Sequence, residues 1–273
     1  MDRAGSRTHA ALAPRAASWD LRVWLFYQQR AVASGKLNAS LRGRPATRWE
    51  DLFMERPFTD RREAGRLLAG PLSAYAGRRD VIVLALPRGG VPIGYEVARA
   101  LRAPLDVLPV CKLGLPWQPE LAMGALSSNG AQYVDSALVR SAGVSEAQLQ
   151  SAMALARIEL GRREARYRGE RAPLAVAGRV AVVVDDGMAT GASLKAAALA
   201  LATLGPARIV AALPVAPAGS QDRLGRTVDE FVCARTPAAF YSVGQFYLDF
   251  DQVSDNTVRE LLAQAAANGA AQI

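Results

Sequence analysis

The sequence is organised around residues 179–205, which read RVAVVVDDGMATGASLKAAALALATLG. Val180–Val184 are apolar and mostly β-branched, which is typical of a short strand buried on both faces. Asp185 and Asp186 end this run, and the small residues of Gly187–Ser193 separate them from an alanine-rich helix. Because the free N–H groups at the start of a helix bind anions, the stretch predicts a strand, a phosphate-binding loop and a helix, in that order.

The motif DDGMATGAS between this strand and this helix resembles the signature of the type I phosphoribosyltransferases, which use 5-phosphoribosyl 1-pyrophosphate (PRPP). The resemblance implies that Asp185 and Asp186 bind the ribose hydroxyls. It also implies that the loop surrounds the 5-phosphate, with Gly187, Met188, Ala189, Thr190, Gly191, Ala192 and Ser193. An ordinary strand-to-helix turn is the alternative, but such a turn has no need of two acids followed by two glycines and two hydroxyls.

Composition excludes several classes of protein. The 273 residues, 51% of them hydrophobic, are enough to bury one substantial core, and no apolar run approaches the roughly 20 residues that span a bilayer. His9 is the only histidine, so a histidine-dependent triad or a multi-histidine metal site is not expected. Cys111 and Cys233 lie in apolar runs and are expected to be free thiols, which indicates a cytoplasmic protein.

Positive charge is concentrated at the start of the chain. The net charge is +8, and residues 1–50 hold nine Lys or Arg against three acids, so the rest is close to neutral and a nucleic-acid partner is not predicted. We expect residues 1–53 to be a poorly ordered basic extension and residues 54–273 to form the domain. Trp19–Tyr27 could form a short helix, and an Arg-rich transit peptide has a similar composition. Our preferred hypothesis is that the extension is dispensable, since Met54 precedes the first regular element.

Strands and helices alternate along the rest of the chain. Helices are expected from Asp60, near Pro92, from Ser145, and over Ser254–Ala266, with Asp60–Glu63 and Ser145–Gln148 in capping positions. Strands are expected at Val81–Leu86, Leu105–Cys111, Val180–Val184, Arg208–Val215 and Asp229–Ala234, and a hairpin at 122–126 and 132–134. This order predicts an α/β fold: a parallel sheet with helices on both faces, its sites at the carboxyl ends of the strands, and a small C-terminal hood at about 236–266.

Two further strand ends carry residues that suit an anionic substrate. Arg88, Gly89 and Gly90 follow the first strand and match the family's pyrophosphate loop, which often contains a cis peptide bond, here between Pro87 and Arg88. Read without the resemblance, the same residues are equally compatible with a plain turn. Lys112 follows the second strand and is a catalytic candidate, although it could instead be a charge facing solvent.

The implied reaction is displacement of pyrophosphate from the anomeric carbon by a nitrogen nucleophile. Its oxocarbenium-like transition state needs separated charge to be stabilised, a role for Mg²⁺ on the pyrophosphate beside Arg88 and Lys112. Asp185 and Asp186 would orient the ribose and hold the metal indirectly. Leu113–Glu120 is expected to be a mobile loop that excludes water.

The acceptor is not defined by these residues. In 6-oxopurine enzymes of the family an acid occupies the position of Ala189, so the acceptor here must be activated in another way or need no deprotonation. Phe246 and Tyr247, within the aromatic segment Phe240–Phe250, could stack on a flat acceptor; a small hydrophobic subcore is at least as compatible with them. The Arg-rich segment Arg157–Arg171 is expected to be a solvated helix face rather than an anion-binding surface.

The sequence therefore predicts a cytoplasmic, Mg²⁺-dependent phosphoribosyltransferase whose substrates are PRPP and an unidentified nucleobase-like acceptor. The resemblance covers about Phe58 to Leu262, and family members are often dimeric, so a homodimer is the assembly it implies. The alternative function is a regulatory protein that binds PRPP without turnover, with Arg157–Arg171 as a surface for RNA.

Overall fold

The computed structural model describes residues 56–128, 130–168, 171–173 and 175–270. The predicted N-terminal extension, residues 1–53, lies outside the described residues. Among the helices that are described, none combines the length and the apolar character needed to cross a bilayer.

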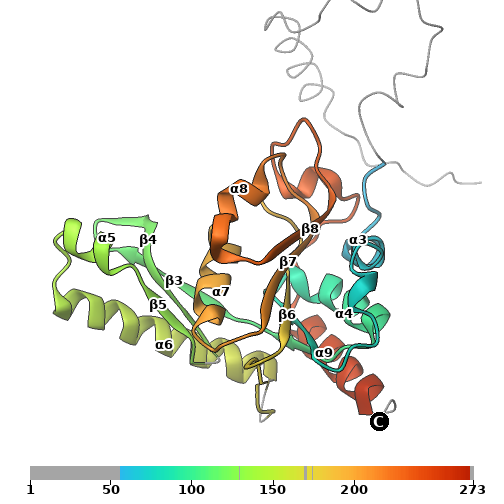
Figure 1. Ribbon diagram of the computed structural model, residues 1–273, viewed down its shortest axis with the longest axis horizontal. Helices are drawn as coiled ribbons and strands as arrows, with labels where there is room; N and C mark the ends of the chain where they lie inside the picture. Colours follow the sequence, from blue (N-terminus) through green and yellow to red (C-terminus); the bar gives the residue numbers. More distant parts are fainter. Residues whose placement is uncertain (1–55, 129, 169–170, 174, 271–273) are drawn as a thin grey trace, which may run out of the picture. The chain divides into compact units, whose positions relative to one another are not determined.

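Five parallel strands form the central sheet, in the order β2-β1-β6-β7-β8. Figure 1 labels three of them, β6, β7 and β8. Val81 lies opposite Val180 and Ala85 opposite Val184, so β1 and β6 end together. Every residue of these two strands is buried, as expected where helices cover both faces. The strands are β1 (Val81–Ala85), β2 (Leu105–Val107), β6 (Val180–Val184), β7 (Arg208–Val215) and β8 (Glu230–Arg235).

Helices cover both faces of this sheet. Ile82 and Leu84 of β1 pack on one face with α7 (Ala192–Ala202). Val81 and Val83 pack on the other face with α3 (Arg61–Ala69) and α4 (Gly90–Leu101), and the alternation follows the two-residue period of a strand. The predicted α/β fold is confirmed.

The C-terminal part of the chain divides between two packing clusters. Phe240–Phe250 pack with Phe58 and Val215, whereas α9 (Asp255–Ala270) packs against α4 and α6. The α8 helix (Ser220–Leu224) was not predicted. The described residues also contain three short 3₁₀ helices. One of them, η2 (Ser73–Tyr75), precedes β1, and the other two are η3 (Gly225–Thr227) and η4 (Val243–Phe246).

A second, antiparallel sheet has the order β3-β4-β5 and packs on α6. Its elements are β3 (Val110–Leu115), β4 (Gln118–Ser127), β5 (Gln132–Val134), α5 (Ser136–Ser141) and α6 (Glu146–Arg168). The helix α7 contacts all three of these strands and also packs on β6, so it lies between the two sheets (Figure 1). The predicted hairpin at 122–126 and 132–134 is confirmed as β4 and β5.

Two predictions in this region were wrong. The expected strand Leu105–Cys111 splits into β2 and β3, because Pro109 has no N–H to continue the ladder. The expected mobile loop Leu113–Glu120 is instead the end of β3, a two-residue turn and the start of β4. Gly114 marks close strand contact rather than flexibility, since a Cβ there would lie 2.4 Å from the Pro119 carbonyl oxygen.

The predicted helix starts are confirmed by their caps. The Glu63 N–H donates to Asp60 Oδ1 at 2.7 Å, and Ser145 exchanges hydrogen bonds with Gln148. The prediction of a solvated face for Arg157–Arg171 was wrong at Arg168. This side chain is buried, with Nη2 3.0 Å from Asp106 Oδ2, because the buried Asp106 carboxylate needs a countercharge.

Candidate functional site

The acidic pair and the loop after β1 meet at the carboxyl edge of the sheet. Asp185 and Asp186 follow β6, and Pro87–Gly90 follows the neighbouring β1. A Cβ at Gly89 would lie 2.0 Å from Asp186 Oδ2, and one at Gly90 would lie 2.6 Å from the Val184 carbonyl oxygen. Only glycine permits this approach, so the two predicted loops form one continuous surface.

The Pro87–Arg88 peptide bond is cis, as the family resemblance implied. The Arg88 guanidinium points to α9, where its Nη1 is 3.6 Å from Asp255 Oδ1. Arg166 of α6 holds the other oxygen of the same carboxylate at 3.2 Å. Asp255 was missed at the sequence level because it lies far along the chain, in the first turn of a helix where an acid is common in any case.

Asp185 and Asp186 share an environment that disfavours two charges. Burial raises the pKa of Asp185 well above its usual range, and the neighbouring Asp186 charge adds to this effect. Burial also raises the pKa of Asp186, although the Arg61 guanidinium opposes the shift. A ligand that supplies hydroxyl donors or a cation would therefore stabilise the ionised form of these two carboxyl groups.

Arg61 is the nearest countercharge, and no sequence pattern predicted it. Its Nε and Nη2 atoms both lie 3.0 Å from Asp186 Oδ2, which makes a forked contact to a single oxygen. The Arg61 guanidinium carbon lies 4.0 Å from the centre of the Phe250 ring, and its Nη1 donates to the Asp251 carbonyl. Since 125 positions separate Arg61 from Asp186, only folding brings them together.

Tyr247 ties the aromatic segment to the acidic pair. Its hydroxyl donates to the Asp186 carbonyl oxygen at 2.6 Å, and its ring lies 5.2 Å from that of Phe58 and 5.0 Å from that of Phe250. Burial raises the pKa of the Tyr247 hydroxyl, so it remains a donor. Phe246 packs on Phe240 at 5.2 Å. The prediction that Phe246 and Tyr247 contact the acceptor stays a prediction, and the structure shows that both rings already have neighbours.

The phosphate loop leads directly into α7. Gly191 has φ +80°, a conformation that favours glycine, and as the N-cap of α7 it has no side chain to offer. The Ala192 N–H, the first of α7, donates instead to Thr190 Oγ1 at 3.4 Å. Met188 is buried beneath the loop, while Ala189, Thr190, Ala192 and Ser193 are exposed. Arg223 of α8, which the sequence did not single out, donates to the Ala189 carbonyl at 2.8 Å.

Lys112 does not end a strand of the central sheet. It lies on β3 opposite Ala125, exposed, in the antiparallel sheet rather than at the end of a central strand. No hydrogen bond or ion pair joins it to the acidic pair within the described residues. The central strand β2 ends at Val107, shortly before Pro109. Lys112 was predicted to follow a longer strand, so it lies beyond the carboxyl end of β2 and not at it.

Paired acids and a small-residue loop at a helix start, at the carboxyl edge of a parallel sheet, are an arrangement typical of α/β proteins that bind phosphorylated ligands. The model of the phosphoribosyl transferase domain family matches residues 62–251, and the chain belongs to this family. The resemblance seen in the motif is thereby confirmed.

Similar proteins agree with this assignment. Two Mycobacterium tuberculosis proteins, from strains CDC 1551 and H37Rv and provisionally named phosphoribosyl transferases, are each 45% identical over 208 residues, which is 76% of this chain and 47% of theirs. The chain thus spans about half the length of these curated relatives. The crystal structure of TT1426 from Thermus thermophilus has a TM-score of 0.70 and 41% identity, and the match covers 77% of this chain and 99% of that one.

Proposed function

We propose that this chain transfers the 5-phosphoribosyl group of PRPP to a nitrogen nucleophile, a nucleobase-like acceptor, with release of pyrophosphate. The observation that carries the proposal is the contact between the two loops. Because Gly89 has no side chain, the Asp186 carboxylate can lie directly against it. The reacting carbon of PRPP lies between its ribose hydroxyls and its pyrophosphate. A site that binds both groups at once must join a diol-binding surface to a pyrophosphate-binding one.

Each part of the site has a proposed role. Asp185 and Asp186 accept hydrogen bonds from the ribose hydroxyls, while the backbone of Gly187–Ser193 and the first turn of α7 bind the 5-phosphate. Arg88, Gly89 and Gly90 bind the pyrophosphate, and Asp255 holds Arg88 in place. Lys112 is the remaining catalytic candidate, from the exposed face of β3. Phe246 and Tyr247 border the acceptor, and Tyr247 positions Asp186.

The residues present fit a magnesium ion. Mg²⁺ prefers oxygen ligands, keeps several waters and commonly shares one or two carboxylates with substrate phosphates. Asp185 and Asp186 supply such oxygens, although Arg61 occupies one of them, so an indirect, water-mediated contact suits the pair. When bound, the ion would neutralise charge on the leaving pyrophosphate.

The test is pyrophosphate release from PRPP with Mg²⁺ and a panel of purine and pyrimidine bases. We expect Asp186→Asn to lower kcat/KM by about 100-fold or more, because a charged acceptor for the ribose hydroxyls is lost. Glu260→Gln is the matched control, since Glu260 is an exposed acid on α9. Equal activity of Asp186→Asn and the control would remove Asp186 from the site. Binding of PRPP without turnover on any base would favour the regulatory alternative.

A further inference from the structure

A large basic groove lies at the opposite, amino-terminal edge of the sheet. It has a volume of about 1380 Å³, and its lining includes six arginines and a single acid, Asp106. The lining comes from the segment before β1, from α4 and the residues that lead from it into β2, from the end of α6 and the residues after it, and from the C-terminal half of α9. None of them belongs to the loops that follow β1 and β6, so the groove is separate from the proposed PRPP site.

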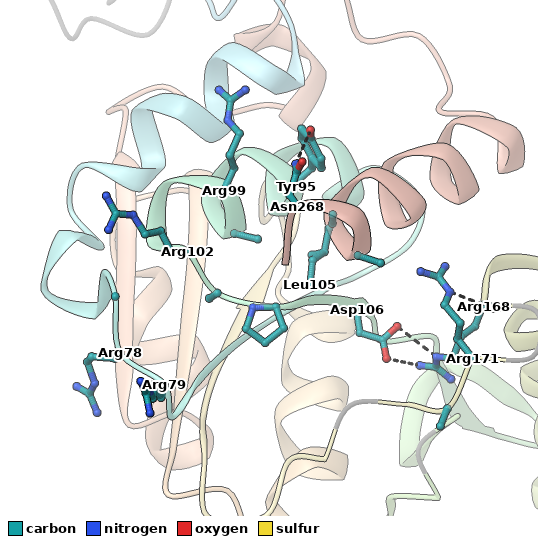
Figure 2. Close-up of a pocket in the computed structure, with 17 residues that line it drawn as sticks. Arg78, Arg79, Tyr95, Arg99, Arg102, Leu105, Asp106, Arg168, Arg171 and Asn268 are labelled. Atoms are coloured by element: carbon teal, nitrogen blue, oxygen red, sulfur yellow. Dashed lines mark hydrogen bonds and ion pairs between the residues drawn. The ribbon is translucent and has the colours of Figure 1, made fainter. Parts of the chain in front are cut away.

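The arginines stand in two banks on either side of an apolar floor. Figure 2 shows Arg78, Arg79, Arg99 and Arg102 on one side, Arg168 and Arg171 on the other, and Leu105 between the banks. The floor is completed by small apolar residues: Ala98, Ala103, Pro104, Ala265 and Ala266. In this view the guanidinium groups of Arg99 and Arg102 point away from Leu105 and lie at the rim of the groove, while Asp106 and Asn268 lie with the apolar residues nearer its middle.

Three of these arginines carry charge that no acid neutralises. Arg78 pairs with Asp80, Arg99 with Glu96, and Arg168 with Asp106. Within the described residues, Arg79, Arg102 and Arg171 form no ion pair. Arg171 is nevertheless held in place, because its Nη1 donates to the Leu262 carbonyl at 3.1 Å.

The conformation of Arg102 adds a second, independent observation. It ends α4 with φ +54°, and among the described residues it is the one non-glycine residue with a positive φ. Glycine is the usual residue at such a helix end, because a Cβ is disfavoured there. An arginine in this place costs stability, which indicates that its guanidinium serves something other than the fold.

We propose that this groove binds a small ligand with a chain of two or more phosphates attached to an uncharged group, the chemistry of a nucleoside diphosphate or triphosphate. One guanidinium can contact two phosphate oxygens at once, so the three arginines without an ion pair among the described residues, Arg79, Arg102 and Arg171, suit the phosphate chain. The volume exceeds the roughly 300 to 1,000 Å³ of most small-molecule pockets, which leaves room for the attached group on the apolar floor.

A nucleic-acid strand fits the groove less well. Proteins that hold single strands provide aromatic rings on which bases stack. The lining contains one aromatic residue, Tyr95; its side chain is buried, Arg62 lies 5.4 Å from its ring centre, and its hydroxyl accepts from Asn268 at 3.5 Å. The ring thus offers no free face for stacking.

The experiment is calorimetric titration of the full chain with ATP, GTP, inorganic tripolyphosphate, adenosine, a uridine decanucleotide and a hexaglutamate peptide. We expect the first three to bind. Tighter binding of a nucleotide than of tripolyphosphate assigns a nucleotide as the ligand, and equal binding assigns the phosphate chain alone; both support the site. Adenosine binding as tightly as ATP, tighter binding of the decanucleotide or the peptide, or no binding of any probe would overturn it.

Variants separate this groove from the PRPP site. Arg79→Gln with Arg102→Gln should weaken tripolyphosphate binding about tenfold or more, whereas Arg140→Gln with Arg226→Gln, two exposed arginines outside the groove, should change it less than about twofold. Thr190→Glu, which places a negative charge in the exposed phosphate loop, should leave this binding intact. Loss of binding in Thr190→Glu together with retention in the groove variant would assign the phosphates to the PRPP loop.

A single substitution distinguishes binding from folding. Arg102→Gly should raise the melting temperature, because glycine accepts the positive φ, and should at the same time weaken tripolyphosphate binding severalfold. A variant that is more stable and binds equally well would show that Arg102 is not part of a ligand site.

Discussion

The two proposed anion sites lie at opposite edges of the central sheet and differ in the groups that they offer to a phosphate. At the carboxyl edge helices begin, so backbone N–H groups and the positive ends of helix dipoles are available, and the residues of the proposed PRPP site include two acids. At the amino edge helices α4, α6 and α9 end, and their carbonyl groups attract cations. An anion site there must rely on side chains, which explains why the groove uses arginine.

The two edges also differ in the surroundings of a carboxylate. Asp186 at the carboxyl edge is paired with Arg61, and Asp106 at the amino edge is paired with Arg168. At the amino edge the side chains of Arg168 and Asp106 are only 2% and 8% exposed. The Asp186 side chain is 18% exposed and has a second acid, Asp185, beside it. The amino-edge pair is thus built for structure, and the carboxyl-edge acids remain available to a ligand.

The largest effect should come from breaking the enclosed pair. Arg168→Ala leaves Asp106 buried without its partner and should lower the free energy of unfolding by about 3 to 5 kcal/mol, measured by urea denaturation at pH 7. Arg163→Ala on the same helix is the control, because its pair with Glu159 is about 40% exposed and should contribute less than about 1 kcal/mol. Equal losses in the two variants would contradict the structural role given to Arg168.

The contact between the two carboxyl-edge loops should be almost as sensitive. Gly89→Ala places a methyl group where Asp186 Oδ2 lies, which must displace the Asp186 carboxylate from its position and lower PRPP-dependent kcat/KM by about 100-fold. Gly161→Ala in α6 is the control, since its Cβ meets nothing within 4 Å and the helix should gain about 1 kcal/mol. Full activity in Gly89→Ala would mean that the loops need not touch.

Removing the countercharge of Asp186 should have a smaller effect that depends on pH. Arg61→Met should cost about 2 kcal/mol of stability at pH 7, because a partly buried carboxylate loses its partner. Arg61 opposes the burial that raises the pKa of Asp186, so without it the carboxyl protonates more readily. The deficit should therefore shrink as the pH falls from 7 toward 4, since a protonated Asp186 needs no partner.

Urea denaturation across this pH range checks the prediction. Arg62→Met is the control, because Glu96, the partner of Arg62, also contacts Arg66 and Arg99. A deficit of Arg61→Met that stays constant with pH would show that Arg61 acts through packing on Phe250 rather than through charge.

The smallest effect should be a gain. The pKa of Asp185 is raised in the folded protein, so ionising this carboxyl lowers the stability. The loss grows as the pH rises from the usual pKa of an aspartate toward the raised pKa of Asp185. Asp185→Asn should then stabilise the protein without ligand by about 1 kcal/mol at pH 7, with a flatter stability profile from pH 4 upward. Destabilisation at pH 7 would mean that the charged form is satisfied within the fold.

Sequence patterns predicted the central sheet well for identifiable reasons. Val81–Ala85 and Val180–Val184 are continuous apolar runs, and each ends at residues that cannot extend a buried strand. The caps at Asp60 and Ser145 depend on neighbours three positions away, so local pattern suffices. The hairpin after Lys112 was missed because its glycine and prolines were interpreted as loop signals, although Gly114 and Pro119 contact each other across the strands.

The sequence by itself determined the family, the α/β order and the strand, loop and helix around Asp185–Ser193, because each depends on residues adjacent in the chain. The tertiary structure alone decided which charges meet: Arg61 with Asp186, Arg88 with Asp255, and Arg168 with Asp106. It also decided that arginines from three separate segments line one groove. Electrostatic contacts act over a few ångströms in space, and distance along a chain does not predict them until the chain has folded.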